Sequence, residues 1–76
     1  MPPLDEDFSA ALVAHDVKLN ARRALRLAGV TSIAKAQTFS YEELLSIKGV
    51  GLYMAPRILT AVGKPIPKGK DPDKWR

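Results

Sequence analysis

The residues best suited to chemistry surround two glycines in the second half of the chain. Gly49, Val50 and Gly51 form a Gly-x-Gly turn between two helical apolar patterns, within the run from Leu44 to Leu59. Glycine adopts the positive φ of a sharp turn at little steric cost, and it lets the backbone approach a ligand closely. A helix that starts after the turn leaves its first N–H groups unpaired at the positive end of its dipole. The pattern therefore predicts a site for an anion such as a DNA phosphate.

The side chains around this turn have distinct expected roles. Val50 should point inward and pin the turn to the core, while Lys48 and Arg57 should add positive charge on either side of the turn. The unpaired backbone donors are expected at Gly51, Leu52 and Tyr53. Contacts to phosphate read no bases, so we expect little sequence preference. The alternative is a turn that serves only to fold the domain.

Length and composition exclude most other kinds of site. A chain of 76 residues makes one small domain without room for a large cofactor. It has no cysteine, which excludes a disulfide framework, a cysteine zinc site and a thiol nucleophile. His15 is the only histidine and has no evident catalytic partner. Asp5, Glu6 and Asp7 are consecutive, so their side chains should point in different directions and not form a metal site. We expect a protein that is not an enzyme and that needs no metal or cofactor.

Charge divides the chain into two parts. Residues 1–16 carry four acidic side chains and no Lys or Arg, whereas residues 17–70 carry ten Lys and Arg and two Glu. A basic body favours a polyanionic partner. The acidic N-terminus lacks the apolar core of a signal peptide, and no apolar run approaches the about 20 residues that span a bilayer. We therefore expect a cytoplasmic, intracellular protein, in the nucleoid or in a host cytoplasm, that does not contact membranes.

Hydrophobic spacing predicts an all-α domain of four to five helices over residues 1–63, followed by a basic tail, 64–76, that is extended or disordered. The helices are expected at residues 5–16, 20–28, 41–47 and 52–62, with a short one before Gln37 that either Thr31 or Ser32 would cap. Pro56 fits only a first turn, so regular hydrogen bonding should begin near Tyr53 or Met54. Trp75 either docks on the domain or lies in a free end.

Capping signals set the helix ends. Asn20 is a good N-cap, and Ser40 with Glu43 fits a capping box. Gly29 and Gly63 stand where left-handed C-terminal stops are expected.

The helix at residues 20–28 should have two different faces. Ala21, Leu25 and Ala28 repeat at helical spacing and are expected to face the core. Arg22, Arg23 and Arg26 lie three and four residues apart and are expected to form one basic stripe.

The chain from about Val17 to Ile58 resembles the C-terminal domain of the bacterial RNA polymerase alpha subunit. The matching text is Leu-Asn-Ala-Arg-Arg-Ala-Leu-Arg-Leu-Ala-Gly-Val (19–30), Ser-Ile (32–33) and Tyr-Glu-Glu-Leu-Leu-Ser-Ile-Lys-Gly-Val-Gly (41–51). The resemblance implies a compact helical domain ending in a helix-hairpin-helix motif. In that family the start of the second helix and the hairpin together grip the minor groove of DNA.

Carried over by position, the DNA-facing places fall on Asn20, Arg23, Gly49, Gly51, Tyr53, Met54 and Arg57. Several differ in type from the family: an arginine position holds Asn20, an asparagine position holds Arg23, and a lysine position in the hairpin holds Tyr53. The position of Arg57 is acidic in the family and contacts a protein partner. We expect the fold to carry over better than the family's preference for A·T-rich DNA.

These observations predict a monomeric, non-enzymatic module that binds double-stranded DNA from the minor-groove side with little sequence specificity. The expected contacts are Asn20, Arg22, Arg23, Arg26, Lys48, Gly49, Val50, Gly51, Leu52, Tyr53, Met54 and Arg57. A small, free-standing phage or bacterial accessory protein of transcription fits the resemblance. The alternative is a protein-interaction module that binds RNA polymerase or a regulator through Leu52, Tyr53 and Met54, because such side chains are enriched at interfaces.

Overall fold

Alternating apolar patterns and turn residues fold this chain into short helices joined by tight connections. The computed structural model describes residues 3–71, which form five α-helices and no β-strand. The helices are α1 (Glu6–Ala14), α2 (Leu19–Leu27), α3 (Ile33–Gln37), α4 (Tyr41–Ser46) and α5 (Met54–Ala61). The radius of gyration is 11.2 Å, close to the roughly 11 Å expected for a compact domain of this length. The prediction of a compact all-α domain is confirmed.

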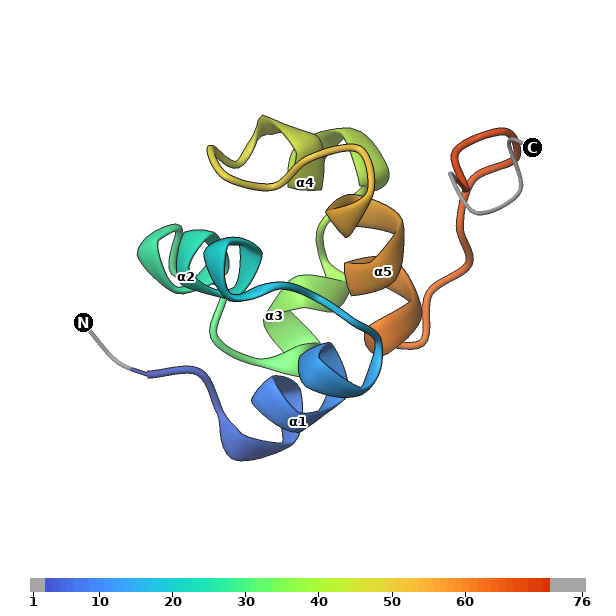
Figure 1. The fold of residues 1–76 in the computed structure, drawn as a ribbon. Coiled ribbons are helices and arrows are strands. Elements are labelled where there is room, and N and C mark those ends of the chain that lie inside the picture. The colour runs from blue at the N-terminus through green and yellow to red at the C-terminus, as the bar shows by residue number, and fades with distance from the viewer. Residues whose placement is uncertain (1–2, 72–76) are drawn as a thin grey trace.

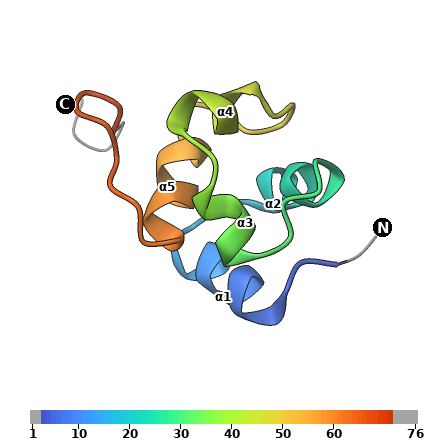
Figure 2. The ribbon, with the colours of Figure 1, turned by 180° about the vertical axis from the view of Figure 1, so that it is seen from behind.

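Helix α5 holds the domain together. It packs against both α1 and α4, while α3 lies among the other helices and α2 lies across from α5 (Figures 1 and 2). The large side chains that are fully buried come from four helices and the turn after α2: Phe8, Leu12, Leu25, Val30, Leu44, Pro56, Ile58 and Leu59. Leu25 was on the predicted inner face of its helix. No described polar or charged residue is buried as a whole.

The predicted helix ends are largely confirmed. Gly29 and Gly63 have φ angles of 82° and 78°. After Gly29 the Val30 N–H donates back to the Leu25 carbonyl at 2.8 Å, the closing bond of a left-handed C-terminal cap. At the start of α4, Ser40 and Glu43 form both bonds of the predicted capping box. Ser32, one of two candidates, caps α3 by accepting a hydrogen bond from the Lys35 N–H at 3.1 Å.

Two predictions about α2 were wrong. Lys18, not Asn20, is the N-cap, because buried Val17 fixes the connection and the helix starts two residues after it. Ala28 is exposed and Ala24 is buried in its place. The physical reason is a long-range contact, since the turn after α4 packs on α2 at Ala24.

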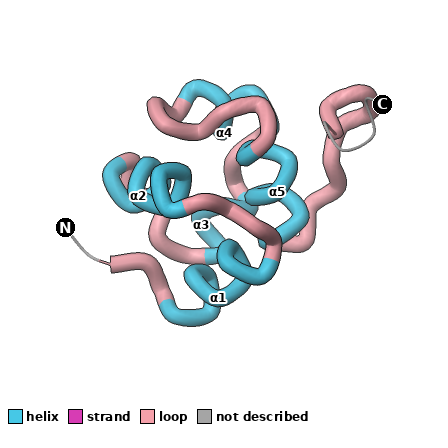
Figure 3. Tube along the Cα trace, in the orientation of Figure 1, coloured by secondary structure: helices cyan, strands magenta, loops and turns pink. Residues whose placement is uncertain are grey.

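The chain after α5 leaves the end of that helix and contacts the region around the start of α4. Residues 64–71 contain no helix or strand and bend back on themselves at the end (Figure 3). The Lys64 Nζ donates to the Phe39 carbonyl at 2.7 Å, and the Lys70 Nζ lies 5.8 Å from the centre of the Tyr41 ring. Trp75 lies outside the described residues, so its placement stays a prediction. Among the helices of residues 3–71, none combines the length and the apolarity needed to cross a bilayer.

Asp16 offers a test of the backbone conformation in the turn after α1. It has a φ of 60° and, of the residues described, is the one non-glycine with positive φ. Glycine adopts this conformation without steric cost, so Asp16→Gly should raise the free energy of unfolding by about 0.5–1 kcal/mol. Urea unfolding followed by circular dichroism measures the change. Asp16→Asn, which removes the charge and keeps the side-chain size, is the control, and an equal gain from it would contradict the backbone explanation.

Candidate nucleic-acid interface

The connection between α4 and α5, residues 47–53, is named the glycine turn. Gly49 has a φ of 100°, and a Cβ built on it would lie 2.9 Å from the Ala24 Cβ, too close for any real contact. Gly51 does not have a positive φ, and a Cβ there would meet nothing within 4 Å. Gly49 therefore provides the sharp turn and the close packing on α2. The prediction of a positive φ holds for Gly49 and not for Gly51, which instead keeps the outer surface open.

The backbone of the glycine turn presents unpaired donors. Val50 is 6% exposed, so its side chain pins the turn to the core as predicted. The N–H groups of Met54 and Ala55 donate to the Gly51 carbonyl at 3.1 and 3.0 Å. Within the described part of the chain, the N–H groups of Gly51 and Leu52 have no acceptor. Helix α5 begins at Met54, where the position of Pro56 predicts that regular hydrogen bonding starts.

Two helices of the described region begin without compensation for the positive end of their dipoles. Helices α3 and α4 have capping serines, and α1 has Glu6 and Asp7 in its first turn. Helices α2 and α5 have neither a side-chain cap nor an acidic residue in the first turn. At α2 the Leu19 and Asn20 N–H groups have no acceptor among the described residues and can donate to an external anion, which the helix dipole favours. At α5 the first N–H groups already donate to the Gly51 carbonyl, so the free donors there are those of Gly51 and Leu52, just before the helix.

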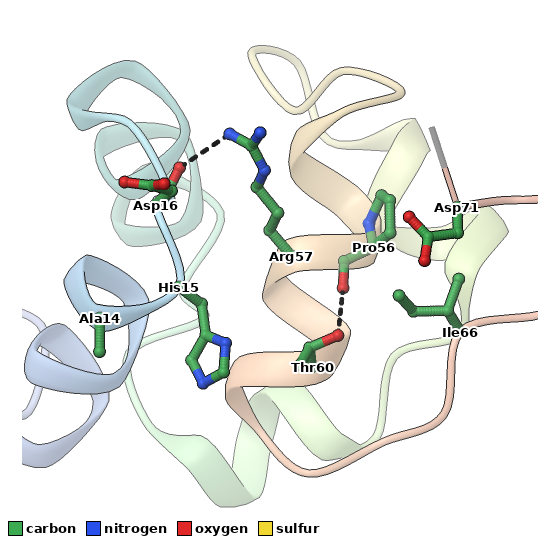
Figure 4. Close-up of a pocket in the computed structure, with 8 residues that line it drawn as sticks. All are labelled: Ala14, His15, Asp16, Pro56, Arg57, Thr60, Ile66 and Asp71. Atoms are coloured by element: carbon green, nitrogen blue, oxygen red, sulfur yellow. Dashed lines mark hydrogen bonds between the residues drawn. The ribbon is translucent and has the colours of Figure 1, made fainter. Parts of the chain in front are cut away.

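The starts of α2 and α5 lie side by side. The Lys18 N–H, at the N-cap of α2, points at the Met54 Sδ, at the first residue of α5, with 3.4 Å between nitrogen and sulfur. The Arg57 Nη1 donates to the Asp16 carbonyl at 3.1 Å, which ties α5 to the connection before α2 (Figure 4). Both contacts hold the two helix starts in a fixed relation.

A groove runs between α2 and the end of α4. It has a volume of about 710 Å³ and combines basic side chains with an apolar floor. Its lining residues are Asn20, Arg23, Ala24, Leu27, Ala28, Ser46, Ile47, Lys48 and Gly49. Asn20, Arg23 and Lys48 are exposed. Within residues 3–71 neither Arg23 nor Lys48 forms an ion pair or a side-chain hydrogen bond, which leaves both charges available to a partner.

The structure brings four of the twelve residues predicted to bind DNA into one groove. Asn20, Arg23, Lys48 and Gly49 share the groove, and Leu52 and Tyr53 are 51% and 56% exposed on the glycine turn. Met54 is half-buried against the start of α2.

The predicted basic stripe is divided. Arg22 and Arg26 line a different hollow, beside the N-terminal segment, and Arg23 lines both hollows. Arg57 is half-buried and holds the Asp16 carbonyl, so the structure gives it a positioning role, and its contact with DNA stays a prediction.

A second concave region lies where α1 ends against α5. Figure 4 shows its lining residues, among them His15, Asp16, Arg57 and Asp71, around a volume of about 310 Å³. The hydrogen bonds drawn there, from Arg57 to the Asp16 carbonyl and from Thr60 to the Pro56 carbonyl, stabilise the fold. His15 is the C-cap of α1. Among the residues that the structure describes, no three His, Asp or Glu side chains gather around one point.

The sequence interpretation missed the apolar floor of the groove. Leu27 is 63% exposed and lines the groove with Ile47. A signal was present, because positions 20, 23 and 27 fall on one face of a helix at i, i+3 and i+7. That face carries Asn20, Arg23 and Leu27 and lies outside the stripe that was expected to face the core.

Comparisons with protein-family models, with curated proteins and with solved structures find no match to this chain.

Proposed function

We propose that this protein is a non-enzymatic DNA-binding module that grips the phosphates of a duplex with the glycine turn and the start of α2. The observation that carries the proposal is the pairing of the uncapped start of α2 with the unpaired Gly51 and Leu52 N–H groups of the glycine turn, beside a basic groove. Two adjacent sets of backbone donors fit two phosphates, and Arg23 and Lys48 supply charge next to them.

The α4–turn–α5 unit supports a helix-hairpin-helix interpretation. The turn is short, Val50 is buried at its centre, and Gly49 packs directly on α2. Through this arrangement Lys48 and Gly49 of the unit line the same groove as Asn20 and Arg23. Approach from the minor-groove side follows from the resemblance to the polymerase alpha C-terminal domain.

Phosphate contacts dominate this interface, so the binding should be weak and sensitive to salt. Non-specific complexes of this kind have dissociation constants of roughly 10⁻⁴ to 10⁻⁶ M at physiological salt. Phosphate contacts carry no sequence information, and the minor groove offers only a degenerate pattern of base edges, so both favour little sequence specificity.

A second candidate function is protein binding by the same face, within the transcription machinery. Leu52 and Tyr53 are half or more exposed, and Leu27 adds an exposed apolar side chain to the groove. Exposed large apolar side chains mark interaction sites when they gather. Under this alternative the partner is RNA polymerase or a regulator, and DNA is not bound.

A bulky residue at Gly51 tests the proposal. The open space around Gly51 and its ordinary φ allow a leucine without strain, so Gly51→Leu should fold with stability close to that of the parent. Its side chain would cover the neighbouring donors, and duplex affinity should fall about 10-fold, the equivalent of about 1.4 kcal/mol. Fluorescence anisotropy with a labelled duplex measures the affinity.

Ala34→Leu is the matched control, because Ala34 is exposed on α3 and does not line the groove. It adds the same bulk and should bind DNA as the parent does. A folded Gly51→Leu variant with the affinity of the Ala34→Leu variant would count against the proposal.

A further inference from the structure

Arg22 is partly buried without a partner for its charge. The side chain is half-buried, and its Nε is buried and has no hydrogen-bond acceptor among the described residues. It is the one buried side-chain polar atom in that part of the chain left in this condition. Burial of one edge of a guanidinium removes water from its charge. An anion bound at the other edge offsets this loss, because arginine binds phosphate and carboxylate through paired N–H groups.

The surroundings of Arg22 form a hollow with the character of an anion site. It has a volume of about 400 Å³ and is lined by Pro3, Leu4, Ser9, Leu19, Arg22, Arg23 and Arg26. Three arginines and one hydroxyl can donate hydrogen bonds there, and no acidic side chain lines it. In the described part of the chain these arginines form no ion pair.

The N-terminal segment makes this hollow a fixed feature. The Asp5 N–H donates to the Thr31 carbonyl at 2.8 Å, and Leu4 packs against the core. The segment runs beneath α2 in both views (Figures 1 and 2). Asp5, Glu6 and Asp7 are exposed at the start of α1 and do not neutralise the arginines.

We infer that this hollow is a second phosphate subsite, which binds the DNA backbone beyond the groove at the glycine turn. The two hollows lie on neighbouring faces of α2 and Arg23 lines both, so the positive charge continues from Lys48 across α2 to Arg22 and Arg26. A linear polyanion that leaves the groove across α2 at Arg23 therefore meets Arg22 and Arg26 next. This inference depends on the proposed function and adds a contact that the helix starts alone do not make.

The Arg22 Nε–Hε group provides a direct readout. Burial slows its proton exchange with water, so its ¹⁵N–¹H signal can be followed in the full chain by NMR. The signal should shift when a short duplex is added and also, at higher concentration, when inorganic phosphate is added at constant ionic strength. A stationary Arg22 signal in both titrations would overturn the inference, and a shift with phosphate alone would overturn DNA as the occupant.

Variants test the same subsite by affinity. Arg26→Gln should weaken duplex binding about 3- to 10-fold and lower the log–log salt slope by about one unit. Arg22→Lys keeps the charge and removes the planar donor set, and it should weaken binding about 3-fold. Lys35→Gln on α3 makes the same charge change as Arg26→Gln outside both hollows and should change affinity less than about 2-fold. Equal affinities for the three variants would overturn the inference.

The two proposals fail in different ways. If backbone amides of residues 49–53 shift with the duplex and the Arg22 signal does not, the subsite fails and the glycine turn remains a DNA contact. If the Arg22 signal shifts with phosphate and no amide of the glycine turn shifts with the duplex, the proposed function fails.

Discussion

A Gly49→Ala variant should unfold roughly 10–20 °C below the parent protein, because two costs combine at this position. The φ of 100° is unfavourable for any residue with a Cβ, and the added Cβ would lie 2.9 Å from the Ala24 Cβ. A left-handed backbone conformation costs a residue with a Cβ about 1–2 kcal/mol, and an added methyl group in a packed region costs about 1–3 kcal/mol. A domain of this length has only a few kcal/mol of stability to lose, on the order of 0.1 kcal/mol per residue. Thermal unfolding followed by circular dichroism measures the shift.

Two other glycines separate the contributions. Gly29 has a positive φ of 82°, but a Cβ there would meet no close neighbour. Gly29→Ala should therefore lower the free energy of unfolding by the backbone strain alone, about 1 kcal/mol. Gly51 has neither a positive φ nor a close neighbour, so Gly51→Ala should unfold within about 2 °C of the parent. Equal stability for the Gly49→Ala and Gly51→Ala variants would show that the turn does not pack on α2 as described.

Reversing the two unpaired charges of the groove should abolish most DNA affinity. The double variant Arg23→Glu/Lys48→Glu removes two predicted phosphate contacts and places two carboxylates beside the duplex. We expect duplex affinity to fall roughly 30- to 100-fold at about 0.1 M salt and the log–log salt slope to drop by about two units. Both residues are exposed and form no ion pair within residues 3–71, so the fold should be unaffected.

A matched variant distinguishes local contacts from net charge. Lys35→Glu/Lys68→Glu makes the same change in charge at two exposed sites that do not line the groove. Its affinity should fall less than about 5-fold, because exposed charges beyond about 10 Å are largely screened at 0.1 M salt. If the two double variants lose affinity equally, the binding is a general effect of net charge and the groove has no special role.

Local signals in the sequence predicted most of the helix ends. The Ser40–Glu43 capping box and the stops at Gly29 and Gly63 depend on residues only a few positions apart, so the sequence contains the whole interaction. Pro56 indicated the start of α5 for the same reason. The predicted cap at Asn20 failed because a capping preference of about 1 kcal/mol was overridden by tertiary packing, with Val17 buried and Lys18 held against Met54.

The basic residues of the candidate site were predicted, whereas its apolar residues and its arrangement were not. Gly49, Lys48 and Arg23 were all singled out, but their meeting in one groove depends on the contact between Gly49 and Ala24. That contact joins residues far apart in the sequence, and no local pattern contains it. The division of the arginines between two hollows and the positioning role of Arg57 have the same origin, because they depend on where α5 and the N-terminal segment lie.

The most direct test of the central claim is a titration of the ¹⁵N-labelled protein with duplex DNA at about 0.05 M and about 0.2 M salt, followed by backbone amide shifts. The account predicts shifts at residues 19–23 and 48–54 at the lower salt, with apparent affinity falling steeply at the higher salt. No shift in either segment at the lower salt would contradict DNA binding and would favour a protein partner for the same face.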